Sequence, residues 1–100
     1  MKLTEVTRVL RSKNAGPSTT TLDLMFVDST GYHLATASKA LTPTYIAMPY
    51  LVPEDKVRVV HFPEALAIKV SLQRRVIAGS PGDRDVYGAQ QHGPMLDIEL

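Results

Sequence analysis

The 100-residue sequence contains no cysteine and no tryptophan. Without cysteine the chain can form neither a disulfide nor a thiolate metal site. The aromatic rings come only from four tyrosines and two phenylalanines. The absence of cysteine therefore excludes disulfide-stapled scaffolds and cysteine-based zinc or iron–sulfur sites as explanations of the fold.

Neither sign of charge is in excess, because 11 Lys and Arg nearly balance 10 Asp and Glu. A nucleic-acid-binding domain typically gathers a strong basic excess on one face, so we expect no nucleic-acid partner. No apolar run approaches the roughly 20 residues that a membrane span requires, and the N-terminal segment lacks the apolar core of a signal peptide. We therefore expect a cytoplasmic protein with no membrane partner, and one domain over residues 1–100.

The first half of the chain shows helical and then strand periodicity. Apolar residues recur at helical spacing over residues 3–12, which predicts a short helix with Thr4 as a plausible N-cap. Residues 19–27 alternate with period two, which predicts a strand. Two further helices are expected, one capped by Ser29 and running to about residue 39, and one opened by Thr42 and Pro43. Pro49 should kink the last of these or end it near residue 47.

The second half is rich in β-forming residues. Residues 57–62 and 65–73 predict two strands, separated by Pro63 and Glu64, and residues 94–100 predict a terminal strand. Residues 74–93 show no clear periodicity and predict a long polar loop. Together these elements predict an α+β two-layer sandwich, with a roughly four-stranded mixed sheet, two to three helices on one face and the long loop before the last strand.

The first candidate site follows the predicted first helix. Arg11, Lys13 and Asn14, next to Gly16, could bind an anion such as a carboxylate or a phosphate. The same residue types are also typical of a helix C-terminus, where cations and left-handed Asn or Gly are favoured. The residue types by themselves favour the helix terminus over the anion site.

The second candidate site lies in the predicted loop, between residues 80 and 92. It gathers acids, amides, a phenol and an imidazole, namely Asp83, Asp85, Tyr87, Gln90, Gln91 and His92. His92 could act as an acid or a base with Asp83 or Asp85. The spacing matches no recognised metal loop, so we predict no metal site, and the residues indicate no particular cofactor. A solvated loop with Asx turns is the alternative.

Asp23 is the remaining unusual residue, because it is a carboxylate within a strand of hydrophobic residues. It either faces water or anchors a neighbouring loop by accepting backbone N–H groups. We expect Asp23, like Gly16, to support a site structurally and not to take part in its chemistry. We also predict that Arg11 and His92 approach one another, which would join the two candidate segments into one site.

Six segments together resemble a known family. They are RSKNAGP (11–17), TLDL (21–24), LTP (41–43), ALAIK (65–69), GSPGD (79–83) and DVYGAQQH (85–92). They are similar to the AtuA-related small domain, named for acyclic terpene utilisation and catalogued as domain of unknown function 4387, from about residue 5 to residue 100. The sequence departs from the family pattern at residues 48–51, where an uninterrupted helix is expected.

The resemblance implies a small chain that docks on a separate, large AtuA-like subunit. By position it carries over the motif residues Arg11, Lys13, Asn14, Gly16, Asp23, Asp83, Asp85, Tyr87, Gln90, Gln91 and His92. Our leading hypothesis is a small or accessory subunit of a metabolic enzyme, with both polar segments at a substrate site or subunit interface. The alternatives are a stand-alone homo-oligomeric enzyme for a carboxylated or CoA-linked substrate, and a non-catalytic ligand-binding or interaction module.

Overall fold

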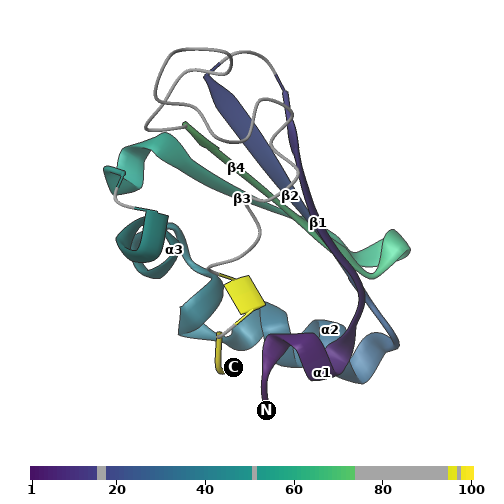
Figure 1. Cartoon of the computed structure of the whole chain (residues 1–100). Helices are drawn as coiled ribbons and strands as arrows, with labels where there is room; N and C mark the ends of the chain where they lie inside the picture. The colour runs from purple at the N-terminus through teal and green to yellow at the C-terminus, as the bar shows by residue number, and fades with distance from the viewer. Residues whose placement is uncertain (16–17, 51, 74–94, 97) are drawn as a thin grey trace.

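The computed structural model describes residues 1–15, 18–50, 52–73, 95–96 and 98–100. Over these ranges the strands form a four-stranded sheet in the order β1-β2-β4-β3, with helices against one face (Figure 1). The elements are α1 (Leu3–Val6), β1 (Thr7–Asn14), β2 (Thr19–Phe26), α2 (Ser29–Ala37), η1 (Lys39–Leu41), α3 (Pro43–Tyr50), η2 (Glu54–Lys56), β3 (Val57–Phe62), η3 (Pro63–Ala65) and β4 (Ala67–Gln73). This arrangement confirms the α+β fold, and the pairing of the described strands is antiparallel rather than mixed.

The N-terminal segment differs from the prediction. The helix ends at Val6 instead of residue 12, its N-cap is Lys2 rather than Thr4, and β1 follows it directly. A ten-residue helix is marginal without packing, whereas β1 pairs with β2 along seven register positions. The strand therefore satisfies the backbone groups of this segment better than the predicted helix would.

Strand β2 lies at the centre of the sheet and forms as predicted. From Leu22 to Phe26 its buried inward side chains alternate with half-buried outward ones, as expected for a strand with one face packed on a core, and Thr21 on the outward face is also buried. Across the connection from β1, the Ala15 N–H donates to the Thr19 carbonyl at 2.9 Å. The first two strands are therefore an antiparallel hairpin, which places residues of the first candidate segment next to β2.

Strands β3 and β4 form as predicted, and they pair as a hairpin. The turn between them is η3, and Leu66 follows it with a φ of 50°. This left-handed conformation is uncommon for a side chain of that size, so β4 begins at Ala67 instead of residue 65. The Leu66 carbonyl accepts from the Phe26 N–H at 2.9 Å, which ties the turn to the end of β2.

The helices begin close to where the sequence placed them. Asp28, not Ser29, caps α2, because its Oδ1 accepts from the Gly31 N–H at 2.9 Å. Helix α3 begins at Pro43 as predicted, but it continues through Pro49 to Tyr50 instead of ending near residue 47. Proline in the last turn removes only one helical hydrogen bond. Packing of the buried side of α3 on the core offsets this loss.

The hydrophobic core lies between the helices and one face of the sheet. Its sheet side is made by Leu22, Leu24, Phe26, Ile68, Val70 and Leu72, each 2% exposed or less. Its helix side is made by Leu3, Tyr32, Ala35, Ile46, Ala47 and Tyr50. Gly31 brings α2 close to α1, since a Cβ at this position would lie 3.0 Å from the Cβ of Val6.

The C-terminal residues do not form the predicted strand of the sheet. In the described residues 95–96 and 98–100, Met95 is buried and Leu96 is 44% exposed, the reverse of the predicted alternation. An isolated bridge joins Glu99 to Lys2, and the Leu3 N–H donates to the Ile98 carbonyl. The terminus therefore pairs with the N-terminal segment, and β1 takes the place of the expected fourth strand.

Within the described part of the chain, no helix is long and apolar enough to cross a membrane. The predicted loop over residues 74–93 lies outside the described residues, as does Gly16.

Candidate functional site

The sheet face that points away from the core carries polar and charged side chains. We call it the outer face. Three rows of residues cross it from β1 to β3 in register: Val9, Met25, Ala67 and Phe62; Arg11, Asp23, Lys69 and Val60; Lys13, Thr21, Ser71 and Arg58. We refer to them as the apolar row, the Asp23 row and the Lys13 row. Since successive rows are two residues apart along each strand, they are separated by about 7 Å.

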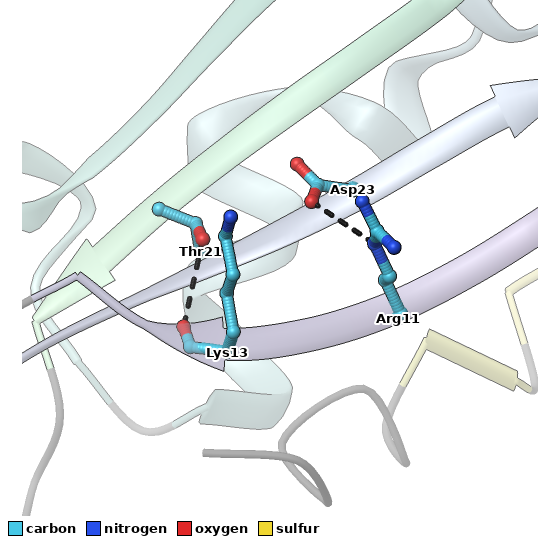
Figure 2. A network of polar contacts seen from close by, with 4 residues as sticks. All are labelled: Arg11, Lys13, Thr21 and Asp23. Atoms are coloured by element: carbon cyan, nitrogen blue, oxygen red, sulfur yellow. Dashed lines mark hydrogen bonds and ion pairs between the residues drawn. The ribbon is translucent and has the colours of Figure 1, made fainter. Parts of the chain in front are cut away.

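Asp23 is at the centre of the outer face and forms an ion pair. The Nε of Arg11 lies 3.4 Å from Oδ2 of Asp23 (Figure 2). The Asp23 side chain is only 18% exposed, whereas that of Arg11 is 63% exposed. The described partner of Asp23 is thus a cation on the adjacent strand and not the backbone N–H groups of a loop, which was one of the two predicted roles.

Lys69 lies on the other side of Asp23, because β4 pairs with β2 at this position. Lys13 lies in the next row, where the Thr21 hydroxyl donates to the Lys13 carbonyl at 3.5 Å. Figure 2 shows the side chains of Arg11 and Lys13 both extending from β1 toward β2. Three cations therefore lie on the two strands that flank Asp23, and Arg11 is in contact with its carboxylate.

A shallow pocket of about 360 Å³ opens over this part of the outer face. In the described part of the chain, its charged lining is Arg11, Lys13, Lys69 and Asp23, and its apolar lining includes Met25, Phe62, Ala65 and Ala67. The volume is at the lower end of the range for sites that hold small molecules. Chemically, the pocket offers a cationic end and an apolar end on the same surface.

Arg11 and Lys13 of the first candidate segment therefore line this pocket, but not in the setting that the residue types favoured. Arg11 and Lys13 are in a strand, so the interpretation as a helix C-terminus is wrong. The strand places both side chains on one face, as an anion site would require. Asn14 is the last residue of β1 and pairs with Thr20, one position along the strand from Lys13.

The second candidate segment cannot be placed in the same way. Asp83, Asp85, Tyr87, Gln90, Gln91 and His92 lie outside the described residues. The predicted approach of Arg11 to His92 and the acid–base role of His92 remain predictions. In the described ranges, no three His, Asp or Glu side chains gather closely enough to hold a metal ion.

Sequence reasoning missed the contribution of β4 and β3 to this site. Lys69, Phe62 and Ala67 line the pocket, yet none was singled out as a candidate. The sequence did contain a hint, since Lys69 and Asp23 each lie at a position of an alternating strand whose side chain is expected to point away from the core. Only the pairing of β2 with β4 shows that the two residues are neighbours.

The sequence was also compared with protein families, curated proteins and solved structures. A family described as a domain of unknown function (DUF4387) matches residues 3–99. The chain belongs to this family. The DUF4387 match spans both the outer face and the second candidate segment, and the family description assigns no activity. No curated protein and no solved structure matches the DUF4387 chain.

Proposed function

We propose that this DUF4387 chain is a small or accessory subunit of a cytoplasmic metabolic enzyme, and that its outer face contributes cationic groups to a substrate site shared with a larger chain. The observation that carries the proposal is the pocket on the outer face, whose described lining includes three cations and one carboxylate. The sheet forms the floor of this pocket, and an open floor of this kind suits a site that a second chain completes.

The resemblance to the AtuA-related small domain supports the same proposal. In that family a similar domain lies at the C-terminal end of a larger AtuA-like region in some proteins, and is a separate short chain in others. This implies that the partner is a large AtuA-like subunit. It also implies that residues 80–92, with His92, belong to the shared site.

An exposed apolar stripe on α3 is a second feature that suits a subunit. Tyr45 and Met48 are 52% and 67% exposed, and their spacing of three residues places them on the same side of the helix. Tyr and Met are enriched at protein–protein interfaces. We propose this stripe as a further contact with the large subunit, because α3 packs beside β3, an edge strand of the sheet, and a chain bound there can also reach the outer face.

Co-purification from the native cell tests the proposal. The tagged wild-type chain should recover a stoichiometric large AtuA-like chain, identified by mass spectrometry and by native mass. Met48→Glu should lose this chain, because it places a charge in an apolar contact. Val27→Glu is the matched control: Val27 is 60% exposed and follows β2 at a distance from α3 along the chain, so its partner recovery should equal that of the wild type.

A partner-free homo-oligomer would contradict the subunit proposal and favour a stand-alone enzyme or a binding module. Equal recovery of the large chain by Met48→Glu and the wild type would remove α3 as the contact. In either case the next experiment is a substrate screen with His92→Ala, which should lose turnover if His92 serves as acid or base.

A further inference from the structure

We infer that the pocket on the outer face binds an amphipathic anion, with a carboxylate or phosphate head at Arg11, Lys13 and Lys69 and a short hydrocarbon chain along the apolar row. This deepens the proposed function, because it names the ligand class of the same surface. Its test uses the purified chain alone and so does not depend on a partner.

The charge of the pocket sets the sign of the head group. Among the described residues the charged lining has three cations and one carboxylate, so these residues attract an anion and repel a cation. Asp23 does not cancel the attraction, because it is mostly covered whereas the Arg11 side chain is 63% exposed. The ligand would meet the cations before the carboxylate.

The Arg11–Asp23 ion pair also prepares the site. Asp23 contacts Arg11 through Nε, and the guanidinium carries further N–H donors on its two terminal nitrogens. These donors suit the paired oxygens of a carboxylate or a phosphate. Holding the long Arg11 side chain in one orientation reduces the rotamer entropy that binding would otherwise cost.

The apolar row explains why the ligand should be more than an inorganic ion. Met25, Ala67 and Phe62 are adjacent across three strands, and Phe62 remains 46% exposed. Ala65, in η3, adds to the apolar lining. Because this row is about 7 Å from the Asp23 row, a ligand with its head at Arg11 and Lys69 would place a chain of several carbons against it.

The arrangement favours a small molecule over an extended polyanion. Both the cationic and the apolar residues line a single pocket of about 360 Å³. A polyanion would gain nothing from the exposed Phe62 ring or from Met25. A short-chain acid or an alkyl phosphate uses both kinds of contact at once.

The test is a titration of the isotopically labelled chain, followed by the shifts of its backbone amides in NMR spectra. The probes are hexanoate, hexyl phosphate, acetate, inorganic phosphate and hexanol. Hexanoate or hexyl phosphate should shift amides of β1, β2 and β4 around Asp23. Its dissociation constant should be roughly tenfold lower than that of acetate or inorganic phosphate, because partial burial of four more carbons has about that effect.

The comparison of hexanoate with hexyl phosphate identifies the preferred head group, and preference for either supports the inference. Lys69→Gln should weaken binding of both, and added salt should weaken it further. Phe62→Ser should weaken hexanoate but not acetate. The matched control is Lys39→Gln, an exposed lysine in η1, which should bind like the wild type. The amide spectrum of each variant shows directly whether it is folded.

Three results would overturn the inference. The first is a shift of the same amides by hexanol with the affinity of hexanoate, which would make the head group irrelevant. The second is binding of acetate as tight as that of hexanoate, which would make the apolar row irrelevant. The third is that none of the probes shifts the amides of the outer face. If the isolated chain binds hexanoate but no large chain co-purifies with it, only the subunit proposal is rejected. If a large chain co-purifies but the isolated chain binds none of the probes, only this inference is rejected.

Discussion

The Nε of Arg11 lies 3.4 Å from Oδ2 of Asp23, across the pairing of β1 and β2 (Figure 2). The contact joins a residue of the first candidate segment to the single carboxylate among the described residues that line the pocket. It follows from the strand register, which places the two residues opposite each other. The relationship therefore makes Asp23 a residue that positions Arg11 and lowers the net charge of the pocket.

Substitution of Asp23 by Asn separates these two effects. Removing one negative charge should raise the affinity for hexanoate about threefold, the size expected for a unit charge about 6 Å away in water. The free energy of unfolding should change by less than about 1 kcal/mol, because the ion pair is largely open to solvent on the Arg11 side. Amide shifts and urea unfolding measure the two quantities. Asp55→Asn, at an exposed carboxylate in η2, is the control; a lower affinity in Asp23→Asn would show that orientation of Arg11 outweighs charge.

The cap of α2 gives a prediction that distinguishes two neighbouring residues. Asp28→Ala should lower the free energy of unfolding by about 1 kcal/mol, since the Gly31 N–H loses its acceptor. Ser29→Ala should change it by less than about 0.5 kcal/mol, as for an exposed position without a capping role. Urea unfolding of both variants checks the assignment. The reverse order of the two losses would return the cap to Ser29, as the sequence suggested.

Thr20 is fully buried, and among the described residues its Oγ1 has no hydrogen-bond partner. Thr20→Val keeps the shape of the side chain and removes the buried hydroxyl, so it should raise the free energy of unfolding by about 1 kcal/mol. Thr21→Val is the matched control on the next residue. Its hydroxyl donates to the Lys13 carbonyl, so the same change should be neutral or destabilising. A less stable Thr20→Val variant would show that the hydroxyl is hydrogen-bonded in solution.

Tyr50 makes the stability depend on pH in alkaline solution. Its side chain is buried, 7% exposed, and burial raises the pKa of its phenol well above the ordinary value of 10.0. Below pH 10 the phenol is protonated in both states and has no effect on the pH dependence. As the pH rises above 10, the unfolded state loses this proton first, so the free energy of unfolding should fall. Unfolding by urea between pH 9 and 11 should show a steeper loss in the wild type than in Tyr50→Phe; equal slopes would contradict the assignment.

Much of the fold followed from local sequence patterns. Alternation located β2 and β4, a run of β-forming residues located β3, and proline at the first helical position located the start of α3. Two predictions failed where local signals conflict with pairing. Apolar spacing over residues 3–12 is compatible with a helix, and residues 94–100 alternate like a strand, yet a hairpin partner was available only to the first. Where the local pattern fits either helix or strand, the backbone hydrogen bonds available from a neighbouring strand decide which one forms.

Of the residues that line the pocket, the sequence identified only those from the N-terminal half of the chain. Arg11, Lys13 and Asp23 stood out because charge within an apolar or Gly-bearing context is unusual. Lys69 and Phe62 did not, because an exposed lysine or phenylalanine in a strand is ordinary when considered alone. Their part in the pocket depends on pairings between β2, β4 and β3, which no local pattern specifies.

By itself the sequence determined the class of fold, the residues available for chemistry and the membership of the DUF4387 family. It did so because periodicity, capping residues and composition act over short stretches of chain. The tertiary structure alone decided that Arg11, Asp23 and Lys69 are neighbours, and that a pocket with a cationic end and an apolar end lies above them. The physical reason is register: shifting a strand by one residue would turn each of these side chains to the opposite face, and register is set by packing of the whole sheet on its helices.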